Sequence, residues 1–477
     1  MLDIIGVFSH SVRRDRIGFM YAIAFAFLFL TLGCRTAVPG STPHTETVHR
    51  ALLRVATSGD YPPFSHWPAQ ALAPVGFSIS LAEAYAQETG ASLQWIRFRW
   101  SELASDLAGG AFDLSLSGIT VRPDRSMQGR FGLALTTSGA MLLVAADSPL
   151  ESAADFDRPS IRLAVHAGGH LERVARRLFG AARIEAVADN ASVLGRLLRG
   201  EVDAVVTDSL EAPLWQRIGQ RRAGTRLRAI GPLTRDRKAA WFPPNHEAEA
   251  MRFNRWLLRA ESTGLLEGLR REFGLPEGRT ADPLPALLSS LYERLSLMPA
   301  VADAKHRLGA PIENPPREQI VLDAAGLAIR KAAREAGIVP PDGLAVRRLF
   351  RAQIEAAKWI QHRQLRNESN ESYEASPDER RAARAALDEV LRPALLYLGD
   401  RISMLLIACL IEPPESLAYQ DVARALEAHD LPESHLRAVY RALSEILKHE
   451  INGGPARRPG PAGTDKEPSG STRTMRP

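Results

Sequence analysis

The first half of the folded chain alternates short apolar strands with helical segments, and this alternation most constrains the fold. Runs such as LLRVAT, FDLSLSG, MLLVAAD and VDAVVTD have the length and composition of strands, and SISLAEAYAQETG and ASVLGRLLRG have those of helices. Chains with this order form α/β domains with mainly parallel sheets, since a helix crosses over between successive strands. Residues 51–275 are therefore predicted to form an α/β domain.

The stretch 287–361 has a helical period, with long polar side chains set among apolar ones. Arg294 and Lys305 lie about three helical turns apart, so they are predicted to share one helix face. Pro315 and Pro316 interrupt the pattern, because proline is tolerated only where a helix begins. A new helix is therefore expected just beyond them.

Arg317 and Glu318 are predicted to open that helix, and a third helix then presents amides at regular spacing. Gln353, Ala357 and Gln361 recur every fourth residue, so they are predicted to lie on one face. This arrangement can direct two or three cations and two amides into one pocket between helices. Such a pocket suits a small dianion and not a polymer.

These motifs resemble the secreted branch of the all-helical chorismate mutases, over about residues 285–445. The resemblance implies an all-α domain at residues 284–452 that converts chorismate to prephenate without cofactor or metal. It implies that Lys305 and Gln361 face the ether oxygen of the substrate. The substrate-binding residues that it implies are Arg294, Arg317, Glu318 and Arg392.

The chemistry of this rearrangement explains those residue types. The protein must hold a folded conformer and stabilise negative charge on the ether oxygen, where one donor contributes roughly 3 to 4 kcal/mol. Arginine forks onto planar carboxylates, whereas lysine suits a single oxyanion. Two positions depart from the family: Asn314 replaces a common aspartate, and Ala357 replaces a small hydroxyl residue. For any one cation taken alone, an ordinary place on a solvated helix face is the alternative.

The α/β half contains segments in the order of the two-lobed periplasmic amino-acid-binding fold, including SGDYPPFS, FDLSLSGITVRPDRS and GEVDAVVTDSLEA. Within that fold it resembles the periplasmic cyclohexadienyl dehydratases. The resemblance implies that Glu211 is the general acid for the leaving hydroxyl and that Arg125 clamps the substrate carboxylate. The further contacts that it implies come from Trp100, Ser117, Thr120, Thr207 and the Ala-Gly-Gly turn at Gly169.

A carboxyl group that donates a proton near neutral pH needs a raised pKa, which burial between closed lobes would supply. The alternatives are a surface carboxylate at a helix start for Glu211 and a core position for Trp100. One departure bears on activity. His170 and Leu171 follow the Ala-Gly-Gly turn, where the dehydratases have a polar Thr-Asn pair.

Composition and the chain ends predict an exported protein of small-molecule function. The chain has 477 residues, two cysteines and a net charge of +5, without a basic run interleaved with aromatic residues. No nucleic-acid partner, metal or cofactor is therefore expected. Residues 1–34 resemble an export signal that ends in a lipoprotein-like box at Cys34, so a lipid anchor there and an uncleaved anchor both remain open. Residues 35–50 are predicted to be a linker, and residues 453–477 a disordered tail.

The leading hypothesis is a periplasmic bifunctional enzyme that acts on chorismate and then on prephenate or arogenate. The alternative is a solute-binding receptor for an amino acid or pathway compound, fused to a chorismate mutase. The surroundings of Glu211 discriminate between them, because a desolvated carboxyl group favours the enzyme. A homodimer through the helical domain is left open.

Overall fold

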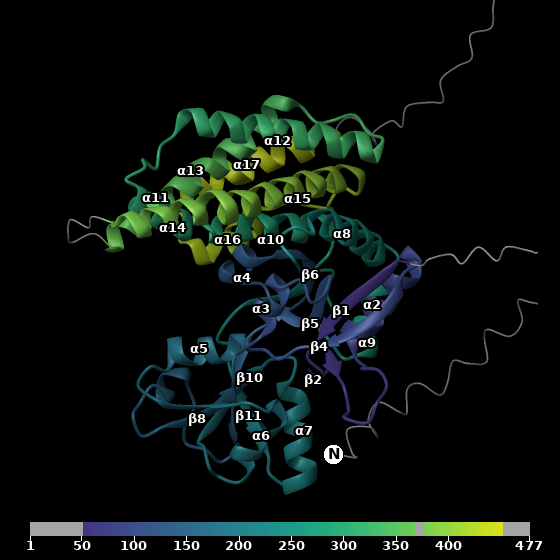
Figure 1. The fold of residues 1–477 in the computed structure, drawn as a ribbon, viewed down its shortest axis with the longest axis vertical. Coiled ribbons are helices and arrows are strands. Elements are labelled where there is room, and N and C mark those ends of the chain that lie inside the picture. The colour runs from purple at the N-terminus through teal and green to yellow at the C-terminus, as the bar shows by residue number, and fades with distance from the viewer. Residues whose placement is uncertain (1–50, 369–374, 452–477) are drawn as a thin grey trace, which may run out of the picture. The chain divides into compact units, whose positions relative to one another are not determined.

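A computed structural model describes residues 51–368 and 375–451. The predicted export signal with Cys34, the linker at 35–50 and the tail at 453–477 lie outside the described residues. Within the described part, strands and helices alternate up to Glu272, and the elements from Pro283 to Ile451 are all helical (Figure 1).

The first lobe of the α/β domain is built on a five-stranded sheet with the order β4-β1-β5-β12-β6. Strand β1 pairs in parallel with β4 and β5, whereas β12 is antiparallel to both its neighbours. Its strands are β1 (Leu52–Thr57), β4 (Ser92–Arg97), β5 (Leu114–Thr120), β6 (Arg130–Ser138) and β12 (Asp236–Phe242). Its other elements are the hairpin β2 (Asp60–Tyr61) and β3 (Ser65–His66), and the helices α2 (Phe77–Thr89), α3 (Leu103–Ala108), α4 (Pro123–Gln128), α8 (Glu247–Ser262) and α9 (Leu265–Glu272).

The second lobe has its own five-stranded sheet, with the order β11-β7-β10-β8-β9. Its strands are β7 (Ala140–Ala145), β8 (Arg162–His166), β9 (Arg183–Val187), β10 (Ala204–Asp208) and β11 (Leu227–Ile230). Its helices are η1 (Ala153–Phe156), α5 (His170–Leu178), α6 (Asn190–Leu198) and α7 (Ala212–Ala223). The chain crosses between the lobes twice, from β6 to β7 and from β11 to β12.

The two-lobed α/β architecture is confirmed, but the expectation of mainly parallel sheets holds only in part. In each sheet a strand next to the crossings, β12 or β7, runs antiparallel to both of its neighbours. These strands carry the chain into or out of a lobe, so their direction is fixed by the crossing and not by a helical crossover. Strand β5, with the sequence LSLSGIT, is buried along its whole length, as expected of a strand inside a sheet.

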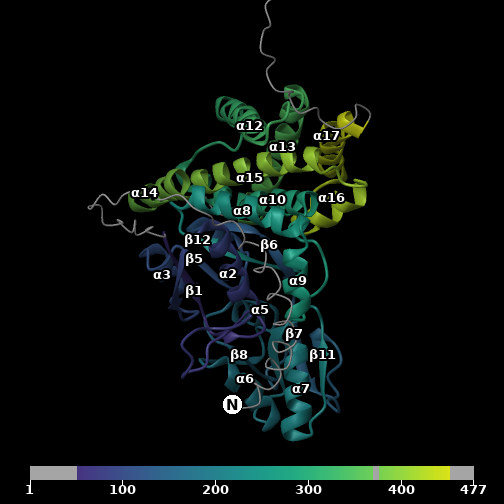
Figure 2. The same ribbon diagram turned by 90° about the vertical axis from the view of Figure 1, so that its right-hand side faces the viewer.

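The helical domain packs its helices around α15, which contacts α10, α12 and α17 (Figure 2). Its elements are α10 (Pro283–Ser296), α11 (Met298–Leu308), α12 (Pro315–Ala336), α13 (Gly343–Glu368), α14 (Pro377–Ala385), the π turn η2 (Ala386–Leu391), α15 (Arg392–Ile411), α16 (Tyr419–Leu426), η3 (Glu427–His429) and α17 (Glu433–Ile451). The run from Pro377 to Ile411 is long and apolar enough to cross a membrane, but most of it is buried within the protein, as in a core helix.

Two local expectations about these helices were wrong. Arg294 and Lys305 do not lie on one uninterrupted helix, because α10 ends at Ser296 and α11 begins at Met298. Pro299, in the first turn of α11, cannot donate the hydrogen bond that would continue α10. Helix α12 starts at Pro315 itself, and the side chain of Asn314 caps it by accepting the backbone N–H of Arg317 at 3.0 Å.

A buried polar cluster joins the helical domain to the first lobe. Arg401 of α15 is fully buried, forms an ion pair with Glu293 of α10, and donates to the carbonyl oxygen of Phe131 in β6 at 2.8 Å. The other carboxylate oxygen of Glu293 accepts the hydroxyl of Ser126 in α4 at 2.9 Å. Removing one partner of such a pair leaves an uncompensated buried charge, so this cluster fixes how α10 meets α4.

Candidate functional sites in the two domains

A closed cleft lies between the two lobes of the α/β domain. Its free volume is about 40 Å³, room for a few water molecules. Both lobes contribute to its walls, so a ligand larger than water enters only when the lobes separate. The residues that line it are Tyr61, Trp100, Gly118, Thr120, Arg125, His166, Gly169, His170, Leu171, Asn190, Glu211 and Lys238.

Glu211 is the acid of this cleft. It lies between β10, which ends at Asp208, and the first residue of α7, and it is only 1% exposed. Thr207 donates its hydroxyl hydrogen to one carboxyl oxygen at 2.8 Å, and the Asn190 amide donates to the other at 2.8 Å. Burial, reinforced by the charges of Asp208 and Asp60, raises the pKa of Glu211 to about 8 despite these two hydrogen bonds. The group is therefore protonated at neutral pH, as a general acid must be.

Two buried cations face the same cleft. Arg125 of α4 donates to the Thr120 carbonyl oxygen at 3.3 Å and makes no ion pair, and burial lowers its pKa to about 9. Lys238 of β12 lies 3.0 Å from Asp208 and donates to the Thr120 hydroxyl at 2.9 Å. Since Lys238 has a carboxylate partner and Arg125 has none among the described residues, Arg125 is the cation available to an incoming carboxylate.

The remaining residues predicted for the cleft divide into two groups. Trp100 lines it and donates its indole N–H to Asp60 at 3.1 Å, and Gly169 lines it at the start of α5. Ser117 was predicted as a cleft hydroxyl, but it does not line the cavity. Its hydroxyl is fully buried and accepts the backbone N–H of Ser58 at 3.1 Å. Side chains alternate between the two faces of a strand, so Ser117 points away from the face on which Gly118 and Thr120 line the cleft.

The lobes are held together by pairs that cross the cleft. His170 of α5 contacts the Asp236 carboxylate of β12 at 2.9 Å, and burial lowers the pKa of His170 although Asp236 opposes that shift. Arg173, one turn further along α5, forms an ion pair with Asp124 of α4 at 3.0 Å. The departure noted at His170 therefore places a new cross-lobe contact beside the cleft.

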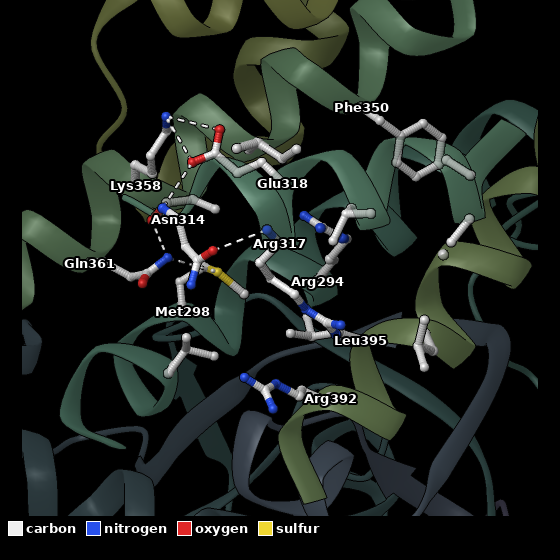
Figure 3. Close-up of a pocket in the computed structure, with 18 of the residues that line it drawn as sticks. Arg294, Met298, Asn314, Arg317, Glu318, Phe350, Lys358, Gln361, Arg392 and Leu395 are labelled. Atoms are coloured by element: carbon white, nitrogen blue, oxygen red, sulfur yellow. Dashed lines mark hydrogen bonds and ion pairs between the residues drawn. The ribbon is translucent and has the colours of Figure 1, made fainter. Parts of the chain in front are cut away.

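The helical domain contains a second cavity, of about 170 Å³ (Figure 3). Five cations line it against two carboxylates, so its field favours an anion. Arg294, Arg317 and Arg392 come from three different helices and turn their guanidinium groups into the same part of the cavity. The charged residues that line it are Arg294, Lys305, Arg317, Lys358, Arg392, Glu318 and Asp400.

Arg294 and Lys305 both line the cavity despite the break between their helices. Arg294 is buried, one of its terminal nitrogens has no hydrogen-bond partner, and burial lowers its pKa to about 10. Lys305 is half-buried, donates to the carbonyl oxygen of Ile312 at 2.8 Å, and has a pKa lowered chiefly by burial. An unsatisfied buried guanidinium is costly without a ligand, which marks Arg294 as a binding position.

Of the two amide side chains predicted to share a face of α13, only Gln361 lines the cavity. Gln361 lines the cavity, donates to the carbonyl oxygen of Ala357 at 3.2 Å, and has no partner for its own oxygen. Ala357 also lines the cavity. Gln353 was predicted to join them, but it is buried outside the cavity with both amide atoms unpartnered. Gln353 and Gln361 are eight residues apart, a rotation of about 80° beyond two full helical turns, which is enough to turn Gln353 away from the cavity.

The outer wall of the cavity carries paired charges. Arg392 begins α15 directly after the π turn η2 and forms an ion pair with Asp388. Burial lowers the pKa of Arg317, and the nearby charge of Arg392 lowers it further. Glu318 lies 3.4 Å from Lys358, a cation that the sequence analysis missed. Among the described residues, no group of His, Cys, Asp and Glu side chains is arranged to hold a metal ion.

Comparisons with known proteins concern the α/β domain. The model of the bacterial extracellular solute-binding proteins, family 3, matches residues 53–276. The chain is 32% identical to cyclohexadienyl dehydratase of Pseudomonas aeruginosa over 219 residues, which are 45% of this chain and 80% of that protein. Through this domain the chain belongs to the family-3 solute-binding proteins.

Two further relatives of the family-3 domain are amino-acid-binding proteins. The arginine-binding extracellular protein ArtP of Bacillus subtilis is 31% identical over 121 residues, 25% of this chain and 46% of that protein. The solved structure of the ancestral amino acid-binding protein AncCDT-1, a precursor of cyclohexadienyl dehydratase, is 27% identical and has a TM-score of 0.43. It covers 47% of this chain and 95% of that chain.

The sequence analysis missed Lys238 and Asn190, which line the family-3 cleft. Lys238 lies on β12, far along the chain from the other site residues, and Asn190 starts α6. A lysine beside the apolar run AAWF was the one available signal, because a charged residue within a buried strand needs a partner. The partner, Asp208, follows from the pairing of lobes and not from any spacing along the chain.

Proposed function

We propose that this chain is an exported bifunctional enzyme of aromatic biosynthesis. The helical domain converts chorismate into prephenate, and the family-3 domain converts prephenate into phenylpyruvate or arogenate into phenylalanine. One observation carries the dehydratase assignment. Glu211 is a buried carboxyl group with a pKa of about 8, in a closed cleft with an unpaired arginine. The similarity to a dehydratase over most of that relative's length supports it.

In the dehydratase step, Arg125 binds the side-chain carboxylate of the substrate and so sets the ring against Trp100. Glu211 gives its proton to the ring hydroxyl as the C–O bond breaks, and water leaves. The electron pair of the bond to the ring carboxylate moves into the ring as carbon dioxide departs, which makes the ring aromatic. Glu211 is left as a carboxylate and regains a proton when the lobes open. While the lobes are closed, bulk water is excluded from Glu211, and its pKa stays raised until the proton has been transferred.

In the mutase step, no group is transferred to the protein. Arg294 and Arg317 bind the two carboxylates of chorismate and hold the folded conformer in which the new carbon–carbon bond forms. Negative charge grows on the ether oxygen as its bond to the ring breaks. Lys305 and the Gln361 amide donate to that oxygen, an interaction stronger in the transition state than in the bound substrate. The excess of cations over carboxylates around the cavity supports this proposal.

A solute-binding receptor fused to a mutase is the second candidate for the family-3 domain. The family assignment and the arginine-binding relative favour it. Against it stands Glu211, since a neutral acid held by Thr207 and Asn190 offers no charge to an amino-acid ligand. A binding site for a cationic amino acid requires an ionised carboxylate, and burial of Glu211 opposes ionisation.

The test is to incubate the purified chain with chorismate and, separately, with prephenate. We expect chorismate to be consumed and phenylpyruvate to form from both. Prephenate bound without turnover, measured by calorimetry beside the absence of phenylpyruvate, would replace the dehydratase with the receptor. Prephenate turnover without chorismate loss would remove the mutase and leave the dehydratase.

Export and assembly complete the proposal. The matching family is described as extracellular, and we propose that residues 1–34 direct this chain to the periplasm. Mass spectrometry of envelope fractions tests this, since intact Met1 on cytosolic protein would contradict it. A mass increase on Cys34 would identify a lipid anchor, and sedimentation at several concentrations would detect a homodimer.

A further inference from the structure

A groove of about 700 Å³ lies where the two crossing segments of the family-3 domain meet the helical domain. Its walls are the end of β6, the segment from Pro232 to Arg237, the helices α10 and α16, and single residues between them. We call it the hinge groove, because both segments that connect the lobes line it. It is separate from the cleft between the lobes and from the cavity of the helical domain.

The hinge groove offers cations that lack carboxylate partners. Arg237 is half-buried, stacks over the ring of Tyr292 at 4.7 Å, and makes no ion pair within the described residues, although the charge of Glu293 acts on it. Arg424 of α16 is exposed and also makes none, whereas Arg235 is paired with Glu427 at 2.6 Å. Two guanidinium groups that line one groove can both donate to a planar anion.

The two carboxylates of the groove, Asp236 and Asp421, each accept hydrogen bonds on one oxygen. Asp236 accepts from His170 at 2.9 Å and from the Thr234 hydroxyl at 2.9 Å. Asp421 accepts the backbone N–H of Ala418 at 2.9 Å and so caps α16. The hydroxyl of Ser138 is buried at the groove wall without a hydrogen-bond partner. The Ser138 hydroxyl therefore adds a buried donor to the cations of the groove, which suits an acceptor ligand.

The floor of the groove is apolar. Leu284, Pro285 and Leu288 of α10 and Ala425 of α16 supply it, together with Pro232. An ion such as inorganic phosphate would leave this surface uncovered. A ligand that combines one carboxylate with an aromatic or branched apolar body would cover the floor and reach both arginines.

We propose that the hinge groove binds a small carboxylate anion with an apolar body, which acts as an effector of lobe closure. Arg237 and Arg424 hold the carboxylate, and the leucine floor holds the body. The ligand bridges both crossing segments and the helical domain, so it binds one hinge geometry better than others and shifts the lobes toward it. Asp236 transmits the shift, because it lines the groove and contacts His170 across the cleft.

Calorimetric titration of the full chain with hydrocinnamate tests the binding step. The matched variants are Arg424→Gln, within the groove, and Arg441→Gln, an exposed arginine of α17 outside it. We expect the wild type and Arg441→Gln to bind one more equivalent than Arg424→Gln, and Arg237→Gln to lose the same equivalent. Equal stoichiometry and affinity in all four proteins would overturn the site, whatever the two reaction centres bind.

Hydrogen exchange tests the effector step in the same proteins. Hydrocinnamate is expected to slow amide exchange at least threefold in residues 137–140 and 231–237 of the wild type and of Arg441→Gln, but not of Arg424→Gln. Hydrocinnamide, the uncharged amide of hydrocinnamate, is expected to leave the exchange rates of these residues unchanged. Loss of the binding equivalent in Arg424→Gln with unchanged exchange at both crossing segments would refute the effector role.

Discussion

The cleft of the family-3 domain and the cavity of the helical domain handle charge in opposite ways. The cleft holds a carboxyl group that burial keeps neutral, and it closes through contacts between separate lobes. The cavity is a space between packed helices with a largely apolar lining, in which charged cations outnumber carboxylates. The first arrangement stores a proton for release, and the second presents donors to charge that appears only during the reaction.

This difference follows from the architecture of each domain. Two lobes joined by two crossing segments can exclude water from a group and later readmit it. Helices packed around α15 cannot separate in this way, so their site must be organised before the substrate arrives. We therefore expect the dehydratase to depend on pH and closure, and the mutase to depend on the placement of its cations.

The largest expected effect is on the dehydratase acid. Glu211→Gln should lower phenylpyruvate formation about a thousandfold, because the amide keeps the shape but cannot release a proton. Prephenate binding and mutase turnover should be unchanged, and both are measured on the same preparation. Full dehydratase activity in this variant would assign the acid to another residue of the cleft.

The next effect is on the mutase donor. Lys305→Ala should lower kcat at least about a hundredfold, since it removes the cation nearest the developing oxyanion. Its matched control is Lys358→Ala, which lies on the same cavity but is paired with Glu355 at 2.8 Å and with Glu318. A loss in Lys358→Ala as large as that in Lys305→Ala would mean that net charge and not position matters.

The pH profiles should separate the two domains. Glu211 has a pKa raised by burial, so the active protonated form is present below about pH 8 and is lost as pH rises through that value. The dehydratase kcat/KM should therefore fall about tenfold for each further pH unit. The mutase should be fully active at pH 7, because the Gln361 amide does not titrate, and any loss at higher pH should follow Lys305, whose pKa burial lowers. Parallel profiles would deny that Glu211 is the acid.

A charge at Gln361 should give the mutase a pH dependence that it lacks. Glutamate has a reference pKa of about 4.3, so Gln361→Glu would place an anion beside the ether oxygen near neutral pH. We expect kcat/KM for chorismate to drop about tenfold at pH 8 and to recover toward acid. Profiles from about pH 4.5 to 8.5 that superimpose on the wild type would show that residue 361 does not face the breaking bond.

The smallest expected effect concerns lobe closure. Arg173→Gln removes the exposed cross-lobe ion pair with Asp124, and exposed pairs contribute only about 0.2 to 1 kcal/mol. The dehydratase KM should rise roughly two- to fivefold. Arg176→Gln is the control, since Arg176 pairs with Glu172 inside the same helix and should change nothing. Equal effects in both would attribute the change to helix α5 and not to closure.

Much of this organisation was accessible from the sequence because it depends on local patterns. Alternating apolar runs gave the strands of both lobes, and helical spacing gave the cavity residues Arg294 and Gln361. The place of Glu211 at the cleft came from the resemblance to the dehydratases, because a helix start by itself predicts a surface carboxylate. The predictions were wrong where residues at a regular spacing in the sequence do not share one helix or one helix face. Pro299 breaks the helix between two site residues, and Gln353 rotates out of the cavity.

The sequence by itself determined which chemical groups this protein has and where each lies along its strand or helix. Only the tertiary structure decided which of them are desolvated and paired. Lys238 meets Asp208, and His170 meets Asp236, through contacts between elements that are distant in the chain. The physical reason is that a pKa or an unpaired charge is set by everything that packs around a group. Periodicity reports only the neighbours on its own element.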